Sequence, residues 1–400
     1  MGKIVDREQE FSFWLQYEKK KMQECAGTLH NLASAFLSDE KEEEPVVDKE
    51  RQNLFLKKRL KESRSLMAGH LKEMASIMEK AAKEKIKIIR LSEKKEKQMA
   101  KLLLQEGLIL EDIFILEKEN GRREAVARLY QNKSSGKKEF CSTEEVSAFL
   151  SVILNMRLIP TIKTPFFITD KPENFRFEED AGYMVLTGFA KTVKEGEKSS
   201  GDSYSFLETD EKLFCAILSD GMGSGKKARE DSEIVLELAE HFLEGGFSAK
   251  LTAKMINDTI LARGEGKNMS TLDICSIDLY TGEAGFLKVG AAYSLLKRDG
   301  YVEKIPTLSL PLGIFYEVEM NQYQKQLLDG DYVFLFSDGI LDCFSGEEGE
   351  EFLKEIVARI PYRRPSEMAG HIMKHAISAS GGQVRDDMTV LVMGIWEKLE

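Results

Sequence analysis

Apolar strands that end in acidic residues place the strongest constraint on what this sequence can fold into. The segments "FCAILSDG" and "YVFLFSDG" run without interruption into Ser-Asp-Gly, at Asp220 and Asp338. A third apolar strand, "MTVLVMGIW", follows directly after Asp386 and Asp387, and a further acidic position is Asp202 in "SSGDSYSF". An ionised carboxylate at the end of a buried strand is costly unless a cation or hydrogen-bond donors satisfy it. The pattern therefore predicts an oxygen-rich site of the kind that hard divalent cations use.

These segments have two other interpretations. Asp-Gly is ordinary turn chemistry, and for any one aspartate taken alone a turn or helix cap is the more common role, so the repetition carries the prediction. The stretch "SDGMGSGKKA" also resembles a P-loop, which requires G-x-x-x-x-G-K-[ST]. Only three residues separate Gly221 from Gly225, and Lys227 stands where Ser or Thr is needed. A nucleotide-dependent kinase or ATPase is therefore disfavoured, and the glycines are expected to let the backbone approach a metal and a phosphate.

The composition limits the class of protein. A length of 400 residues predicts two or three domains, and a formal net charge of −11 argues against nucleic-acid binding. The 5 scattered cysteines form no C-x-x-C pair, which favours a reducing compartment without disulfides or a thiolate zinc site. No apolar run approaches about 18 residues and no signal-peptide pattern is found, so we expect a cytoplasmic chain.

Residues 1–106 are rich in Lys and Glu and are expected to form a long helical or coiled-coil linker region. Apolar residues from Met22 to Phe36 are spaced three and four apart, and a 4-3 rhythm continues from Leu56 to Met78. This stripe is equally consistent with packing inside the domain and with self-association. The basic segment 83–101 is interpreted as a solvated helix face rather than a membrane contact.

The pattern changes near Gly107. Apolar and polar residues alternate, as in strands, on both sides of Asn120-Gly121, which is a hairpin signal. A capping box from Ser142 to Glu145 predicts the start of a helix. A small α/β module is therefore expected over residues 107–170. Residues 171–400 hold amphipathic helices near 230–243 and 248–262 between hairpin-linked strands, which predicts an α+β fold with a mainly antiparallel sheet core.

A set of motifs in residues 171–400 resembles one known family. The segments "SGDSYS", "SDGMGSG", "STLDICSIDL", "FLKVGAA", "LPLGI", "FSDGI" and "RDDMTV" look like those of the metal-dependent PPM-type (type 2C) serine/threonine protein phosphatases, most closely the members that act in bacterial sporulation. The resemblance implies an α/β/β/α layered sandwich, preceded by a regulatory module and long helices. By motif match it implies two Mn²⁺ or Mg²⁺ ions and a set of catalytic and metal-binding groups, namely Asp202, Asp220, the Gly221 carbonyl, Asp338 and Asp386, with Asp387 and Asp342 as weaker matches.

The resemblance also implies an activity and partners. Phosphoserine or phosphothreonine would be hydrolysed by a hydroxide that bridges the two metal ions, without a phosphoenzyme. Eukaryotic members carry a proton-donating His two residues after the matching aspartate, where this chain has Met222, so no general acid is assigned. The implied substrate is a phosphorylated STAS-type anti-sigma factor antagonist, and a division protein is a further expected partner.

One alternative belongs to a different class of protein. The chain is also consistent with a scaffold or adaptor of the division or sporulation machinery, in which the helical region carries the function. Similar proteins have a membrane-spanning region ahead of the helical linker. The chain is therefore also consistent with the soluble cytoplasmic part of a membrane protein.

Overall fold

The computed structural model forms two compact units. One consists of Met1–Ala26 with Met78–Asp180, and the other of Gly27–Ile77 with Ala181–Glu400. The described backbone comprises residues 2–38, 50–132, 141–263, 269–307, 309–315, 320–361 and 363–398. Side chains are described over the same ranges except for residues 2–11, 14, 38, 50–57, 59 and 263. Each unit has a hydrophobic core of its own.

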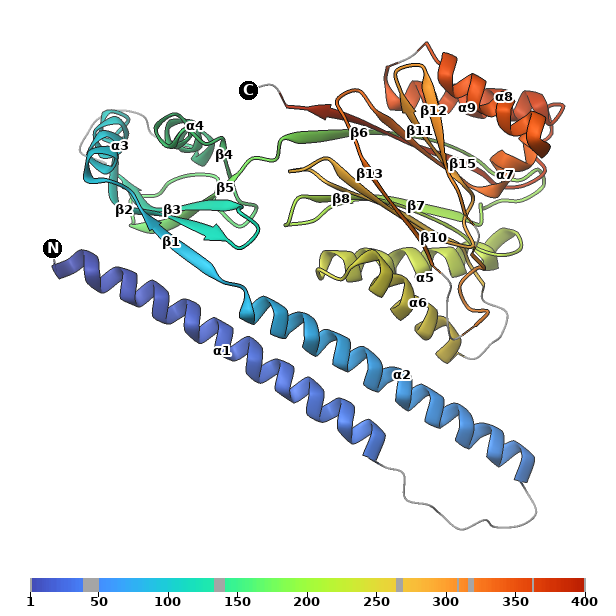
Figure 1. The fold of residues 1–400 in the computed structure, drawn as a ribbon, viewed down its shortest axis with the longest axis horizontal. Coiled ribbons are helices and arrows are strands. Elements are labelled where there is room, and N and C mark those ends of the chain that lie inside the picture. The colour runs from blue at the N-terminus through green and yellow to red at the C-terminus, as the bar shows by residue number, and fades with distance from the viewer. Residues whose placement is uncertain are drawn as a thin grey trace. The chain divides into compact units, whose positions relative to one another are not determined.

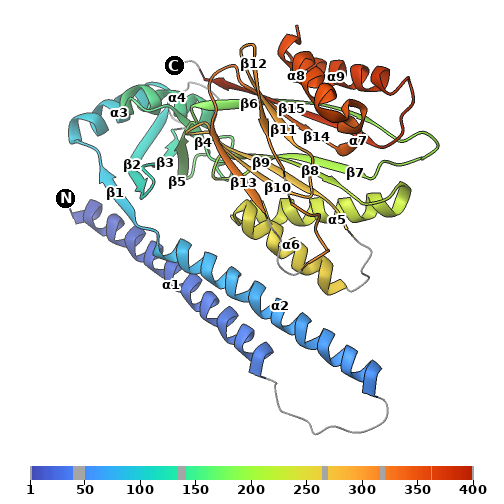
Figure 2. The same ribbon diagram turned by 45° about the vertical axis from the view of Figure 1, so that its right-hand side comes forward.

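Two long helices open the chain, as the Lys- and Glu-rich sequence predicts. Helix α1 is Gly2–Ser38 and helix α2 is Glu50–Lys83, and Figures 1 and 2 show them side by side in opposite directions. Among the described side chains of the two helices, the buried apolar ones are alanines one heptad apart on each helix, namely Ala26 and Ala33 on α1 and Ala68, Ala75 and Ala82 on α2. Small side chains let helix axes approach closely, so this alanine line replaces the larger residues as the buried face.

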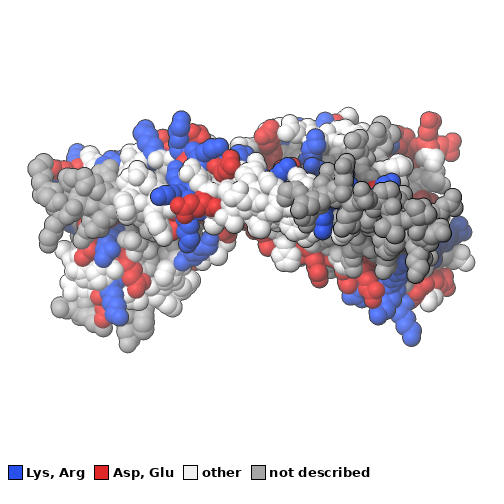
Figure 3. Space-filling model, turned by 90° about the horizontal axis from the view of Figure 1, so that it is seen from below, with Lys and Arg blue, Asp and Glu red and all other residues white. Residues whose placement is uncertain are grey.

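The 4-3 stripe predicted from Leu56 to Met78 is therefore not buried throughout. Leu60 is 55% exposed and Met67 is 51% exposed, while the side chain of Leu56 lies outside the described residues. No helix in the described ranges is long and apolar enough to cross a membrane. On the face shown in Figure 3, basic and acidic side chains are interspersed over the described surface. Self-association through the exposed part of the stripe stays a prediction.

The small unit contains a five-stranded antiparallel sheet in the order β1-β2-β3-β5-β4 with two helices. Its elements are β1 Ile86–Arg90, α3 Glu93–Gln105, β2 Leu108–Lys118, β3 Arg123–Gln131, α4 Thr143–Leu154, β4 Leu158–Pro160 and β5 Glu173–Glu179. The predicted hairpin joins β2 to β3. The predicted capping box is confirmed, because the side chains of Ser142 and Glu145 each accept the other residue's backbone N–H at 3.2 Å.

One expectation for this unit was wrong. The basic segment 83–101 is not one helical face, because β1 intervenes before α3 begins. Three of the five residues in "IKIIR" are isoleucine, whose branched side chain favours a strand. The sheet with its helices thus extends from Ile86 to Glu179, beyond the boundaries 107–170 expected for this module.

The larger unit is built on two five-stranded antiparallel sheets. The first has the order β13-β10-β9-β8-β7 and the second the order β12-β11-β14-β15-β6. The strands are β6 Tyr183–Thr192, β7 Asp202–Glu208, β8 Leu213–Asp220, β9 Leu272–Asp278, β10 Glu283–Val289, β11 Ser294–Arg298, β12 Tyr301–Ile305, β13 Asn321–Gln326, β14 Tyr332–Phe336 and β15 Met388–Glu397. Residues of both sheets, including Phe286 and Leu391, meet in one core between them.

Helix pairs cover the outer face of each sheet (Figure 1 and Figure 2). Helices α5 Gly225–Glu244 and α6 Ala249–Arg263 pack on the first sheet through a core that includes Val235 and Ile256. Helices α8 Gly346–Arg359 and α9 Pro365–Ala379 pack on the second. The expected α/β/β/α sandwich is therefore confirmed.

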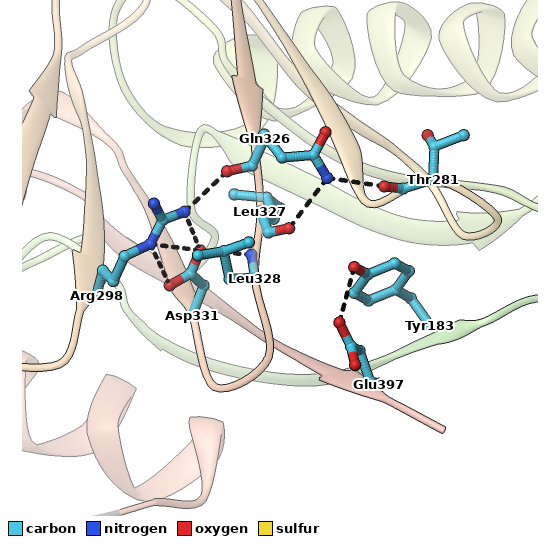
Figure 4. A network of polar contacts seen from close by, with 8 residues as sticks. All are labelled: Tyr183, Thr281, Arg298, Gln326, Leu327, Leu328, Asp331 and Glu397. Carbon is cyan, nitrogen blue, oxygen red and sulfur yellow. Dashed lines mark hydrogen bonds and ion pairs between the residues drawn. The ribbon is translucent and has the colours of Figure 1, made fainter. Parts of the chain in front are cut away.

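Polar contacts join the two sheets at the end where β14 begins (Figure 4). The guanidinium of Arg298 on β11 donates to both carboxylate oxygens of Asp331 and, at 2.8 Å, to the carbonyl of Gln326 on β13. The Gln326 amide in turn donates to the carbonyl of Thr281 at 2.7 Å. At the same end, the backbone N–H of Tyr183 on β6 donates to the carbonyl of Leu279 at 2.9 Å. The bonds from Arg298 to Gln326 and from Tyr183 to Leu279 cross from one sheet to the other.

Candidate metal and phosphatase site

The four predicted aspartates lie at strand ends on the other end of the sandwich, two from each sheet. Asp202 opens β7 and Asp220 closes β8, and the two are direct partners in the antiparallel register. Asp338 begins the short helix α7 Asp338–Leu341 just after β14, and Asp386 stands two residues before β15. Alternation of strand direction in an antiparallel sheet thus brings positions far apart in sequence to one edge.

Two glycines allow close backbone approach at this edge. A Cβ on Gly221 would lie 2.0 Å from the carbonyl oxygen of Ala228, in the first turn of α5. A Cβ on Gly339 would lie 2.1 Å from the carbonyl oxygen of Asp387. Neither distance is compatible with a side chain. The glycine of each Ser-Asp-Gly segment is therefore required by packing, and this packing fixes the direction of the adjacent aspartate.

The electrostatics show that the carboxylates are crowded. Burial, followed by the charges of the neighbouring aspartates, raises the pKa of Asp220 to about 9. Burial raises the pKa of Asp202 to about 6, against hydrogen bonds from Thr389 and Ser337 that lower it. The pKa of Asp338 is raised by burial and then by the charge of Asp386. Like charges in a buried site disfavour one another, and a divalent cation would remove this repulsion.

The donor set fits a hard divalent cation. Asp202 is buried, and its Oδ2 accepts a hydrogen bond from the Thr389 hydroxyl at 2.6 Å, while its Oδ1 has no hydrogen-bond partner. A buried carboxylate oxygen without a partner is costly unless it binds a cation. Within the described ranges, no three His, Cys, Asp or Glu side chains are gathered closely enough to hold a metal ion. Asp220 and Asp338 instead share a hydrogen bond, which is how two crowded carboxyl groups avoid repulsion without a cation.

Asp387 and Asp342, the two weaker motif matches, have different surroundings. Asp387 is buried, and its two carboxylate oxygens accept the backbone N–H groups of Lys194 at 2.8 Å and Gly201 at 2.7 Å. It therefore anchors the loop that leads into Asp202. Asp342 follows α7, and its charge contributes to the raised pKa of Asp338.

Sequence reasoning did not assign roles to several supporting residues. Thr271 accepts the backbone N–H of Asp220 through Oγ1 at 2.9 Å and returns its own N–H to the Asp220 carbonyl at 2.8 Å. Thr389 and Thr271 both belong to motifs that carried the family resemblance, so the motifs were the available signal. Met222 is half exposed and supplies no acid, which leaves the general acid unassigned.

A small cavity with both polar and apolar lining lies next to the aspartates. Its volume is about 30 Å³ and its lining includes Asp220, Asp338 and Asp273. Asp273 is fully buried, and its Oδ2 accepts from the buried ammonium of Lys288 at 2.6 Å. Lys288 also donates to the carbonyl of Ala292 at 2.8 Å and to the hydroxyl of Ser294 at 2.7 Å. The pair thus ties β9, β10 and the start of β11 together behind the site.

An antiparallel two-sheet sandwich covered by helix pairs, with aspartates from both sheets at one end, defines a PP2C-type phosphatase domain. The family model for Stage II sporulation protein E (SpoIIE) matches residues 210–396, and the model for the SpoIIE regulatory domain matches residues 21–158. The chain belongs to the SpoIIE family.

Individual relatives agree with this assignment. The chain is 30% identical over 365 residues to Stage II sporulation protein E of Bacillus subtilis (strain 168), which covers 90% of this chain and 44% of that protein. It is 22% identical over 202 residues to "Phosphoserine phosphatase RsbU" of the same organism, covering 49% of this chain and 60% of that protein. The solved PP2C phosphatase domain and regulatory-domain fragment of Bacillus subtilis SpoIIE aligns with a TM-score of 0.63 and 28% identity, over 90% of this chain and 100% of that one. The chain spans less than half the length of the SpoIIE relative.

Proposed function

We propose that this chain is a metal-dependent protein phosphatase that hydrolyses phosphoserine or phosphothreonine. The observation that carries the proposal is the meeting of Asp202, Asp220, Asp338 and Asp386 at one end of the sandwich, with a buried Asp202 oxygen left unpartnered. Membership of the SpoIIE family supports the same class of reaction. The substrate we propose is a phosphorylated STAS-type anti-sigma factor antagonist, and the working location is the cytoplasm.

Some residues of the site would bind the metal ions, and others orient those ligands. Asp202, Asp220, the carbonyl of Gly221, Asp338 and Asp386 would hold two Mn²⁺ or Mg²⁺ ions. When bound, such ions lower the pKa of coordinated water and stabilise the phosphoryl oxygens. Hydrogen bonds orient the ligands themselves, since Thr389 fixes one oxygen of Asp202 and Thr271 fixes the backbone of Asp220. Ligands held in this way bind a metal more tightly than mobile ones.

A scaffold or adaptor role in division or sporulation is the second candidate function. The exposed apolar side chains Leu60 and Met67 on α2 favour it, because they offer a surface for another helix. Under this alternative the helical region would act by association, with the phosphatase activity secondary. Association with a division protein and self-association are both proposed on this ground.

The experiment that tests the phosphatase proposal compares Asp338→Asn with the native chain. Phosphate release from a phosphorylated STAS-domain antagonist is measured with Mn²⁺, with Mg²⁺ and after chelation. We expect Asp338→Asn to lower turnover by several orders of magnitude, because it removes one predicted ligand. Asp299→Asn, in the turn between β11 and β12, is the matched control and should be fully active. Native-level turnover by Asp338→Asn in chelated buffer would refute the metal assignment, and metal-independent association without phosphate release by the native chain would favour the scaffold.

A further inference from the structure

Asn257 on α6 is a buried polar residue that the proposed chemistry does not use. It is fully buried, and its amide makes two hydrogen bonds with the loop that precedes β13. Nδ2 donates to the carbonyl of Phe315 at 2.9 Å, and Oδ1 accepts the backbone N–H of Gly313 at 2.9 Å. One bond requires a donor and the other an acceptor, so the amide can adopt one orientation only. Asn257 therefore fixes the position of residues 313–315 relative to α6.

The same loop is bonded to the strand end that carries a predicted metal ligand. Leu312 is buried, and its N–H donates to the carbonyl of Ser270 at 2.9 Å. Isolated antiparallel bridges join Leu312 to Ser270 and Ser270 to Gly221. The Ser270 hydroxyl also donates to the carbonyl of Asp220 at 2.8 Å. Asn257 is thus connected to the Asp220-Gly221 main chain through its bond to Gly313, the adjacent Leu312, and the bonds of Ser270.

This connection adds to the main-chain bonds that remain where the regular ladder ends. The ladder between β8 and β9 stops at Leu218 opposite Asp273, two residues short of Asp220. On the β9 side, this segment is therefore held by isolated bridges, by side-chain bonds and by single main-chain bonds such as that from the Thr271 N–H to the Asp220 carbonyl at 2.8 Å. Ser270 is central to them, and it is itself held from its far side by Leu312.

We propose that Asn257 is a positioning residue for the metal site, which holds the Asp220-Gly221 main chain in place through residues 312–315 and Ser270. The proposal rests on the proposed function, because it assumes that Asp220 and the Gly221 carbonyl bind the metal. Asn257 touches neither substrate nor metal in this arrangement. Its effect should therefore be seen in metal affinity rather than in the chemistry of a loaded site.

The test measures binding of Mn²⁺ alone to the full chain by titration calorimetry, together with the thermal midpoint of the metal-free protein. Asn257→Leu removes both amide bonds at similar volume, and Asn257→Asp keeps the acceptor for Gly313 but loses the donor to Phe315. Thr252→Val is the matched control on α6, because Thr252 is fully buried and its hydroxyl has no hydrogen-bond partner. Substituting a residue that orients a metal ligand typically weakens metal binding by about 10- to 100-fold. We expect a loss of Mn²⁺ affinity in this range for Asn257→Leu and a smaller loss for Asn257→Asp.

Turnover at saturating Mn²⁺ is the second measurement, and there Asn257→Leu should approach the native rate while Thr252→Val matches the native chain throughout. If Asn257→Leu does not fold, Asn257→Asp decides the question on the same two measurements. A lowered thermal midpoint with native Mn²⁺ affinity would show that Asn257 only stabilises the fold, and would overturn the inference. If the native chain itself binds no Mn²⁺, both the proposed function and this inference fail. If the native chain binds Mn²⁺ and Asn257→Leu binds it equally well, only this inference fails.

Discussion

Replacing Lys288 by methionine is the sharpest test of how the core behind the site is held. Lys288 and Asp273 are both completely buried, and the ammonium is satisfied by three oxygens. Methionine has a similar length but no charge, so Lys288→Met leaves the Asp273 carboxylate buried without a counter-ion. Breaking a buried pair from one side costs about 3–5 kcal/mol. At about 2–4 °C per kcal/mol for a domain of this size, the thermal midpoint should fall by roughly 6–20 °C.

The pH dependence of this loss has a definite sign. Burial raises the pKa of Asp273, and Lys288 opposes that rise, so the variant should bind a proton at Asp273 over a wider pH range than the native chain. A carboxyl whose folded pKa lies above its unfolded value loses stability as the pH rises above the unfolded value of about 3.9. Asp273 takes up this proton in both chains, so the difference in free energy of unfolding between them should grow with pH only above the raised folded pKa of Asp273 in the native chain, where its carboxyl is ionised and that of the variant is still protonated.

The assay is equilibrium urea unfolding in chelated buffer, which removes any contribution from bound metal. The double variant Lys288→Met with Asp273→Leu replaces both charges by apolar groups, and such replacements are often neutral or stabilising, so it should recover most of the loss. A loss below about 1 kcal/mol for Lys288→Met, or a double variant less stable than the single one, would refute the reasoning.

Two further predictions concern protons and association. Because the pKa values of Asp220 and Asp202 are raised to about 9 and about 6, a metal must displace protons, so Mn²⁺ affinity should rise with pH up to about 9, and metal-free stability should fall from about pH 4 to about pH 9. Calorimetry in buffers of different ionisation enthalpy measures the released protons, and their absence at pH 7 would contradict the prediction. Glutamate at Leu60 and Met67 should reduce self-association in sedimentation experiments, whereas Ser65→Glu on the same helix should not; unchanged sedimentation of all variants would show that the stripe mediates no association.

The larger fold was predictable because its signals are local. Uninterrupted apolar strands, turn residues and amphipathic helices all occur within short windows, so an α+β domain with antiparallel sheets could be predicted from them, whereas the α/β/β/α sandwich was implied by the family resemblance. The position of β1 was missed because one strand of five residues lies between charged helical segments. The alanine line of the first two helices was missed because alanine is too common in helices to mark a face, whereas Leu60 and Met67 look like core residues and are exposed.

The sequence indicated which aspartates lie at one end of the sandwich, but not which residues support them. Asp220 and Asp338 can be recognised in the sequence because each follows an apolar strand, and the family motifs indicate Asp202 and Asp386. A lone Asn257 in a helix carries no such signal, because its partners are main-chain groups more than fifty positions away. Hydrogen bonds of this kind depend on tertiary structure, and no local pattern specifies them.

The bonds that join the sheets around Arg298 make the geometry at the opposite end sensitive to small rotations. Strand β8 has 8 residues, and at about 3.3 Å per residue it extends roughly 26 Å from the end of the sandwich that holds the Arg298 contacts to Asp220. A change of about 2° in the angle between the sheets would therefore move Asp202 and Asp220 by about 1 Å relative to Asp338 and Asp386. Metal–ligand distances tolerate only about 0.2 Å. A rotation between the sheets that is too small to disturb the core would thus decide whether the four aspartates lie close enough together to bind a metal ion.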